Sequence, residues 1–442
     1  MAAGASILRA GGKAADAAVA TAFAAFVAEL PLASPAGSGV ALVGSAEQGF
    51  SALDFFSVHP GRGLPTGRPT DLDFHVVTVD FGATTQDFHV GRGAAAVPTA
   101  LFGLLELHRR HGSMPLAALL EPAIGLAREG CEMSPQVCWI IELLRPIMTM
   151  NDAVRDLHGD GERLVVAGER LTNSAMADFL EALARDGESL LRGSFTDTVL
   201  DAFGPQRGGL LTRADLEHYA PRWLPPLRVP FRGLDVLTMP PPSSGGALIA
   251  LGLRLAEQFE LSSAEFLGPS HLRSIASLLA TVDRARGLGF DDLVKRPELV
   301  SELLTDEAIA RIRREHLEPV PEPALGSTTH ISVLDQQGGA VSITLTNGEG
   351  CGHVLPGLGV HMNNFLGEQD INPGGFHSEP AGTSMATMMA PTVVLEQDQP
   401  RLVLGSGGSN RIRSAILQAM VASLVFERPI SECCNAPRMH VE

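Results

Sequence analysis

The sequence predicts an α/β protein, and three features of the chain indicate this class. Hydrophobic residues make up 45% of the 442 residues and charged residues 19%, which is the balance of a globular protein. Near the start, an alanine-rich segment over 17–28 leads through a glycine-rich turn into an apolar strand over 40–43. Near the end, the strand 402–404 runs into the glycine-rich turn 405–411 and then into an apolar helix over 412–426. Strands and helices joined by short glycine turns are typical of α/β folds.

The alanine-rich segment 17–28 is predicted to be a buried helix. Arg9 and Lys13 precede it, as in a signal peptide, but Asp16 and Glu29 bound it and twelve residues are too few to span a membrane. We therefore expect neither a signal peptide nor a membrane anchor in this chain, and its compartment stays open.

Helices are also predicted along the middle of the chain. Apolar residues at helical spacing predict two packed helices over 99–130 with a break at 112–115, and the composition predicts further helices over 134–225. A strand over 234–239 follows, then a helix from about Ala247 and another over 271–286. The proline-rich segment 317–326 is expected to be a linker.

A hairpin is predicted directly after that linker, with strands over 328–335 and 340–346. Its second strand alternates apolar residues with Ser342, Thr344 and Thr346, which is the usual pattern of a strand with one solvated face. If the turn closes on Gln337 and Gly338, Thr346 lies opposite Thr329 and only diagonal to Thr328.

Charge and cysteine content exclude several classes of function. The net charge is 33 minus 50, or −17, so the phosphate backbone of a nucleic acid would be repelled. The five cysteines have the number and spacing of neither a disulfide framework nor a metal site, and they are expected to be inert thiols. His108 and His111 lie at helical spacing without a third ligand, which favours a solvated face. No metal and no cofactor is predicted.

The turn 405–411 is the strongest candidate for chemistry by pattern alone. A glycine-rich turn between a strand and a helix can present backbone N–H groups to a phosphate or an oxyanion, although it can equally be a tight structural turn. The turn lacks both the lysine of a phosphate-binding P-loop and the third glycine of a dinucleotide fingerprint. HExxH, GxSxG and EF-hand motifs are absent from the sequence.

The chain resembles the γ-glutamyltranspeptidases in seven blocks that occur in the family's order. These blocks are residues 11–20, 112–115 with 121–130, 239–246, 328–333, 389–392, 405–411 and 435–438. The resemblance implies an N-terminal nucleophile hydrolase with a four-layer αββα sandwich, made as a proenzyme and cut between Ser327 and Thr328. Residues 1–327 would be the large subunit and 328–442 the small one, apparently without the family's final strands, and both would form one structural domain.

The resemblance also implies the roles of individual residues. Thr328 would be the nucleophile, with its freed α-amine as the general base, so that no Ser-His-Asp relay is needed. Thr346 would hydrogen-bond this nucleophile. Gly408 and Ser409 would donate backbone N–H groups to the tetrahedral oxyanion.

The chain departs from the family in the pocket that holds a γ-glutamyl group. Where the family has a carboxylate-binding arginine this chain has Phe56, and the family's serine pair becomes Thr387 and Met388. Losing a guanidinium removes the strongest geometric match to a carboxylate. Glu368 would take the place of the carboxylate that binds the substrate amine, and the expected asparagine is displaced to Asn347.

Taken together, these features predict a γ-glutamyltransferase-like amide hydrolase or transferase that acts through a threonyl acyl-enzyme. Its partners would be a small amide substrate, water or an amine acceptor, and its own fragments as a heterodimer, with any further oligomer left open. One alternative is an amidase that resembles the cephalosporin acylases and prefers a non-glutamyl acyl group. A second alternative, from another class, is an unprocessed and inactive binding protein.

Overall fold

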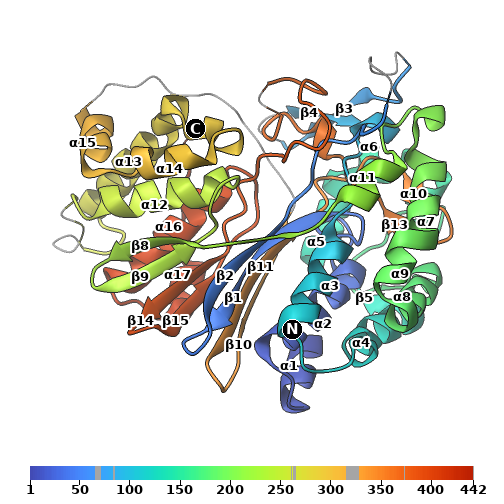
Figure 1. Ribbon diagram of the computed structural model, residues 1–442, viewed down its shortest axis with the longest axis horizontal. Helices are drawn as coiled ribbons and strands as arrows, with labels where there is room; N and C mark the ends of the chain where they lie inside the picture. Colours follow the sequence, from blue (N-terminus) through green and yellow to red (C-terminus); the bar gives the residue numbers. More distant parts are fainter. Residues whose placement is uncertain are drawn as a thin grey trace.

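The computed structural model describes residues 1–64, 71–82, 85–259, 261, 265–314, 328–372 and 374–441. Two antiparallel sheets lie face to face in the middle, and helices cover the outer face of each sheet (Figure 1). The predicted αββα sandwich is therefore confirmed. The predicted linker 317–326 lies outside the described residues.

The first sheet has the strand order β10-β11-β1-β2-β7. Its strands are β1 (Ser38–Ser45), β2 (Gly49–Phe55), β7 (Arg222–Leu224), β10 (Thr329–Leu334) and β11 (Gly339–Thr346). The helices on its outer side are α2 (Ala14–Ala28), α3 (Ala100–His111), α4 (Leu116–Glu129) and α8 (Ser174–Asp186). The predicted alanine-rich helix is α2, which is apolar on all sides because it packs between β10 and β11 on one side and α3 and α4 on the other.

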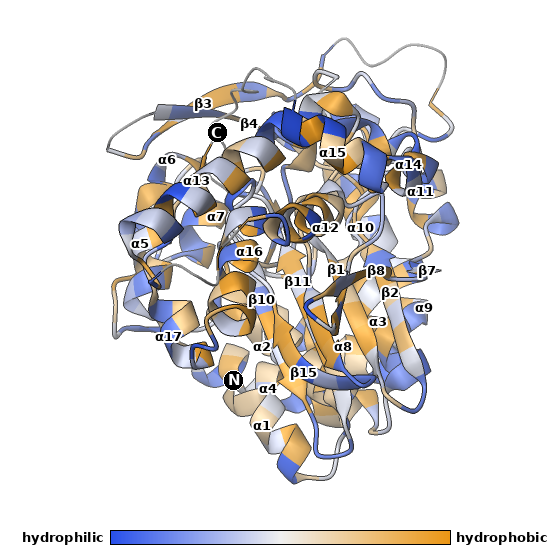
Figure 2. Ribbon diagram, turned by 90° about the vertical axis from the view of Figure 1, so that its left-hand side faces the viewer, coloured by the Kyte–Doolittle hydropathy of each residue, from blue (hydrophilic) through white to orange (hydrophobic). Residues whose placement is uncertain are grey.

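The second sheet has the order β15-β14-β9-β8. Its strands are β8 (Leu227–Phe231), β9 (Leu234–Thr238), β14 (Thr392–Glu396) and β15 (Gln399–Leu404). The helices on its outer side are α12 (Ser244–Ala256), α13 (Pro269–Arg284) and α16 (Arg411–Leu424). Figure 2 shows the hydrophobic strands enclosed between these helices and those of the first layer. Arg413 of α16 pairs with Asp283 of α13 inside this layer.

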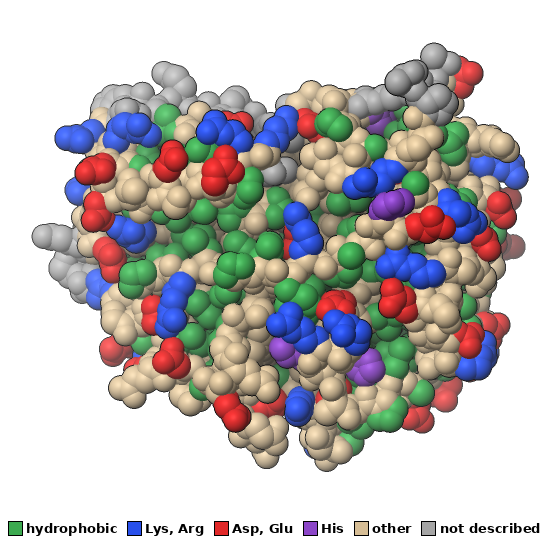
Figure 3. Space-filling model, viewed as in Figure 1, with side chains coloured by type: hydrophobic (Ala, Val, Ile, Leu, Met, Phe, Trp, Pro, Cys, Tyr) green, Lys and Arg blue, Asp and Glu red, His purple; other side chains and the backbone are tan. Residues whose placement is uncertain are grey.

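The remaining elements surround the sandwich. The helices are α1 (Ala2–Arg9), α5 (Pro135–Leu143), α6 (Arg145–Met148), α7 (Asp152–Leu157), α9 (Glu188–Leu190), α10 (Thr196–Phe203), α11 (Arg213–His218), α14 (Val300–Leu303), α15 (Asp306–Arg314) and α17 (Ile430–Asn435). The short strands are β3 (His75–Asp80), β4 (Thr85–Val90), β5 (Cys131–Glu132), β6 (Arg170–Leu171), β12 (Val354–Leu355) and β13 (Val360–His361). In the described part of the chain, none of the helices has the length and apolarity needed to cross a bilayer. On the face in Figure 3, acidic and basic side chains are interspersed.

The β10–β11 hairpin differs from its prediction by one residue of register. Thr329 pairs with Leu345, and Asp335 donates its N–H to the carbonyl of Gly339 at 2.9 Å, so the loop has three residues rather than two. Gly338 closes this loop at φ +79°, a conformation that favours glycine. The predicted pairing of Thr346 with Thr329 is therefore wrong. Extending the observed register by one residue places Thr328 directly opposite Thr346.

The hydroxyl-bearing face of β11 is buried, so the prediction of a solvated face is also wrong. Ser342 and Thr344 have no exposed surface, because this face of the first sheet lies against the second sheet. The hydroxyl of Ser342 donates to the carbonyl of Leu404 at 3.0 Å and accepts the N–H of Thr392 at 3.2 Å. Ser342 thus supplies hydrogen bonds that join the two sheets, while the Thr344 hydroxyl contacts His330 within the first sheet.

Candidate active site

The glycine-rich turn after β15 packs directly against the start of β10. A Cβ atom on Gly407 would lie 2.4 Å from the carbonyl oxygen of Thr328, and one on Gly405 would lie 2.2 Å from the ring of His330. Glycine is therefore required for this close approach. Gly408 and Ser409 both have positive φ, at +109° and +49°, and lie beside Thr328 between β15 and α16. The turn predicted from sequence thus lies next to the predicted nucleophile.

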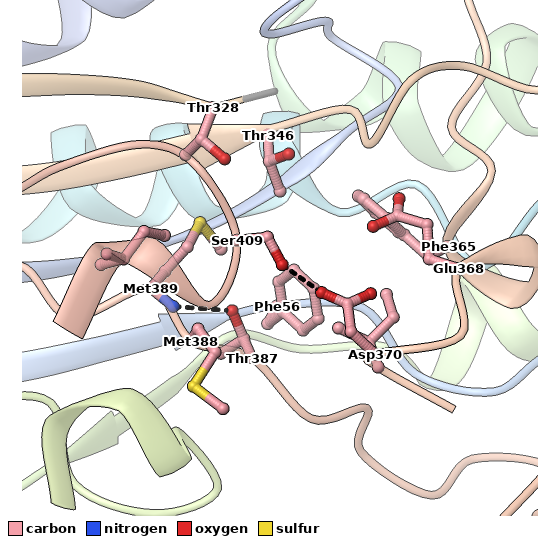
Figure 4. A pocket seen from close by; sticks show the side chains of 12 residues that line it. Phe56, Thr328, Thr346, Phe365, Glu368, Asp370, Thr387, Met388, Met389 and Ser409 are labelled. Atoms are coloured by element: carbon pink, nitrogen blue, oxygen red, sulfur yellow. Dashed lines mark hydrogen bonds between the residues drawn. The ribbon is translucent and has the colours of Figure 1, made fainter. Parts of the chain in front are cut away.

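A small cavity of about 40 Å³ gathers most of the predicted site residues from separate parts of the chain (Figure 4). Its lining includes Thr328, Thr346, Phe56, Glu368, Thr387, Met388 and Ser409. Figure 4 shows the side chains of Thr328 and Thr346 next to each other, as the hairpin register requires. Gly408 lies on the other side of Thr328, where it lines a second and larger cavity.

Thr346 ends strand β11 and Asn347 follows it, but only Thr346 reaches the cavity. The hydroxyl of Thr346 accepts the N–H of Gly348 at 3.1 Å, which fixes its orientation. Asn347 is 1% exposed and donates its side-chain amide to the carbonyl of His361 at 3.4 Å. It does not line the cavity, so its role in substrate binding stays a prediction.

Two carboxyl groups, Glu368 and Asp370, face the cavity from one loop. Burial, followed by the charges of Glu349 and Asp370, raises the pKa of Glu368 well above its usual range. Burial also raises the pKa of Asp370, while hydrogen bonding from Ser409 and the charge of Arg286 oppose this. Glu368 Oε1 is buried without a hydrogen-bond partner within the described chain. The pair favours a cationic or hydrogen-bond-donating group in the cavity.

Asp370 was missed from the sequence, although a signal for it existed. It accepts a hydrogen bond from the hydroxyl of Ser409, which Figure 4 shows as a dashed line. In an extended segment, residues two apart point the same way, so Glu368 and Asp370 can face one cavity together. Phe365, Ile371, Met389 and Ile412 also line the cavity and carried no recognisable sequence signal.

The side of the cavity where a carboxylate-binding arginine was expected is apolar. Phe56 is 5% exposed, and its ring centroid lies 5.3 Å from that of Phe365. The hydroxyl of Thr387 accepts the N–H of Met389 at 3.1 Å. The residues that line this cavity in the described chain include neither lysine nor arginine. A buried carboxylate would therefore lack a charged partner here.

His330 follows Thr328 on the same face of β10, but it is a poor general base. Burial lowers the pKa of His330 to about 3. Its Nδ1 lies 2.8 Å from the hydroxyl of Thr344, and its Nε2 lies 2.9 Å from that of Ser332. A base acts best when its pKa lies near the working pH, so Thr328 needs another base. The described residues contain no group of three or more metal-ligating side chains.

An αββα sandwich with a threonine at the start of strand β10, beside a turn of backbone N–H groups, defines an N-terminal nucleophile hydrolase. The family model for gamma-glutamyltranspeptidase matches residues 1–442, and the chain belongs to this family. The chain is accordingly an enzyme, an amide hydrolase or transferase of a family that uses a threonine nucleophile. Membership of an enzyme family counts against the alternative of an inactive binding protein.

Curated relatives cover nearly the whole chain. The chain is 33% identical to the acylase ACY 1 proenzyme of Pseudomonas sp. (strain SE83), with 100% of this chain and 80% of the relative covered. It is 32% identical to the glutathione hydrolase proenzyme of Pseudomonas aeruginosa, with 99% of this chain and 80% of the relative covered. Both relatives are proenzymes by name.

Solved structures share the fold. The cephalosporin acylase from Bacillus halodurans matches with a TM-score of 0.80 and 26% identity, over 99% of this chain and 80% of its own. The gamma-glutamyltranspeptidase of Helicobacter pylori matches with a TM-score of 0.61 and 23% identity, over 73% of this chain and 90% of its own, which supports the fold alone.

Proposed function

We propose that the chain cuts itself between Ser327 and Thr328 and then transfers the acyl group of an amide to water or an amine through a Thr328 ester. One observation carries this proposal: the hairpin register sets Thr328 opposite Thr346, beside the Gly407–Gly408 turn and at a cavity with two carboxyl groups. Ser327 lies outside the described residues.

In the cut, the Thr328 hydroxyl adds to the Ser327 carbonyl carbon and gives up its proton. The Ser327–Thr328 C–N bond breaks, the nitrogen takes a proton, and water hydrolyses the resulting ester. The freed α-amine of Thr328 then stands next to its own hydroxyl and removes its proton when the substrate arrives. This role suits a site in which the pKa of the nearby His330 is only about 3.

The oxyanion of each tetrahedral intermediate would accept the backbone N–H groups of Gly408 and Ser409. Their positive φ values turn this backbone away from helical geometry before α16 begins. Removing one such donor in other enzymes costs about 3 kcal/mol of transition-state stabilisation.

The cut would yield fragments of 327 residues and, by 442 minus 327, 115 residues. In the first sheet β11 pairs with β1, and in the second β14 pairs with β9, so each sheet holds strands from both fragments. The fragments would stay together as a heterodimer within one structural domain.

The acyl group is proposed to be less anionic than γ-glutamate. Phe56 and Phe365 occupy the side where a guanidinium was expected, while Glu368 and Asp370 favour a cation or a donor. A glutathione-type substrate would keep its amine contact and lose its carboxylate contact. The acylase-like alternative is favoured by the same phenylalanine pair, and the ACY 1 relative bears an acylase name.

The test joins processing with a substrate screen. Mass spectrometry and N-terminal sequencing should find a fragment that begins at Thr328 in the wild-type protein and one intact chain in Thr328→Ala. A γ-glutamyl anilide is then compared with a β-lactam that carries an uncharged side-chain acyl group. A single uncut chain in both proteins, without turnover, would reject the proposal.

A further inference from the structure

The larger cavity on the other side of Thr328 has an unusual wall. It measures about 330 Å³ and shares only Thr328 with the small cavity. Its remaining lining consists of Leu32, Phe81, Gln136, Trp139, Ile140, Leu143, Leu144, Glu349, Gly407, Gly408 and Arg411. A volume of this size accommodates a ring-containing ligand, whereas about 40 Å³ does not.

Helix α5 supplies that wall with a regular stripe. Gln136, Trp139, Ile140 and Leu143 recur at helical spacing and all line the cavity. The opposite stripe of α5, formed by Val137, Cys138 and Ile141, is buried in a core cluster. The helix is therefore apolar on two sides. Ile140 and Leu143 of the first stripe also pack against the edge of this core cluster, whereas Trp139 stays exposed, so the core does not account for the tryptophan.

Trp139 lies at the mouth of this cavity with 63% of its surface exposed. An exposed tryptophan presents a large planar apolar surface to water, and its burial by an aromatic ligand is favourable. Together with Phe81, Ile140 and Leu143, it forms an open apolar face beside the nucleophile.

The two cavities meet at the atoms where an amide would react. Gly408 lines the large cavity and Ser409 lines the small one, so the turn of N–H groups lies on the boundary between them. A substrate whose carbonyl oxygen points at this turn has its two halves in different cavities. The acyl half stays bound to Thr328 after the first step, while the amine half has to leave. Because the residues proposed to hold the acyl half, among them Phe56 and Glu368, line the small cavity, the amine half falls in the large one, whose wall includes the exposed Trp139.

We infer that the cavity lined by the Gln136–Leu143 stripe binds the amine half of the substrate and that this half is apolar and aromatic, with its ring against Trp139. This inference rests on the proposed function, because it takes Thr328 as the nucleophile. It adds the chemical class of the leaving amine and a residue that selects it.

The test compares two amides of the same acyl group, chosen by the substrate screen: a 4-nitroanilide and a methylamide. Trp139→Ala should lower kcat/KM for the nitroanilide about tenfold and change that for the methylamide less than twofold. Comparing variant with wild type for each substrate cancels their different intrinsic reactivities. Trp139→Phe should recover most of the loss, and hydrolysis of the acyl-enzyme, which follows amine release, should be unchanged.

The matched control is Leu334→Ala, which removes another exposed apolar side chain at the far end of β10 from Thr328. It should leave both substrates unaffected. An equal loss for both substrates in Trp139→Ala, or an effect on self-cleavage alone, would overturn the inference while leaving the proposed function intact.

A binding measurement separates this inference from failure of the proposed function. The chain has two tryptophans, so Trp223→Phe leaves Trp139 as the single reporter. Free 4-nitroaniline should quench its fluorescence saturably, and methylamine should not, whether or not the protein turns over a substrate. Linear, non-saturable quenching by 4-nitroaniline would overturn the assignment.

Discussion

Replacing Gly407 with alanine tests the contact between the turn and the nucleophile. The added Cβ would lie 2.4 Å from the Thr328 carbonyl oxygen, whereas ordinary contacts begin near 3.4 Å, so the two segments must separate by about 1 Å. Gly407 does not have positive φ, and the substitution therefore adds a steric contact without backbone strain. A misplacement of about 1 Å in an active site costs about 100-fold in rate.

We expect Gly407→Ala to fold with a loss of about 1–3 kcal/mol in unfolding free energy, and to lose self-cleavage and turnover by about 100-fold. The measurements are thermal unfolding, N-terminal sequencing over time, and kcat for an amide substrate. Gly125→Ala is the control, because this α4 glycine has nothing within 4 Å of an added Cβ. Gly125→Ala should raise the free energy of unfolding by up to about 1 kcal/mol and keep full activity. A Gly407→Ala protein that is processed and turns over within twofold of wild type would refute the close packing described here.

Three further predictions concern charge. Phe56→Arg should raise kcat/KM for a γ-glutamyl anilide, relative to a neutral acyl anilide, by about tenfold, through charge-assisted hydrogen bonds to the substrate carboxylate; an unchanged ratio would count against the proposed acyl subsite. Glu368→Gln should raise the melting temperature more at pH 8 than at pH 5. The raised pKa of Glu368 means that the native state keeps this proton to a higher pH than the unfolded state does, so the wild-type protein loses stability as pH rises and the glutamine variant does not. An equal effect at both pH values would contradict this. Burial lowers the pKa of His158 to about 4, so its contribution to the unfolding free energy is fully present above pH 6.5 and falls by up to about 3 kcal/mol toward pH 4. In urea unfolding, the unfolding free energy of His158→Gln should therefore fall less between pH 6.5 and pH 4 than that of the wild-type protein.

Much of the fold was predictable from local signals. The alanine-rich helix, the two helices around the 112–115 break and the turn before α16 carry periodicity and glycine patterns that fix local structure. Burial of the β11 hydroxyl face was not predictable, because alternation looks the same whether the polar face meets water or a second sheet.

The site was predictable only in part, for a similar reason. Of the residues that line the small cavity, Thr328, Met389 and Ser409 lie in the blocks that resemble the family. The position of Thr328 opposite Thr346 depends on a three-residue loop closed by Gly338. One residue of register moves every side chain to the opposite face, so a small error in the turn misplaces the nucleophile. Phe365 and the α5 stripe join the site through tertiary packing alone.

The interleaving of strands on either side of the proposed cut also affects how the mature enzyme withstands damage. Strand β11 pairs with β1 along eight residues, so the two fragments cannot separate without opening the first sheet. Before the cut, a chain that unfolds can refold in a unimolecular reaction. After the cut, refolding requires two different molecules to meet, and its yield falls with dilution. Maturation would then turn a protein that recovers from unfolding into one whose working lifetime is set by its rate of unfolding.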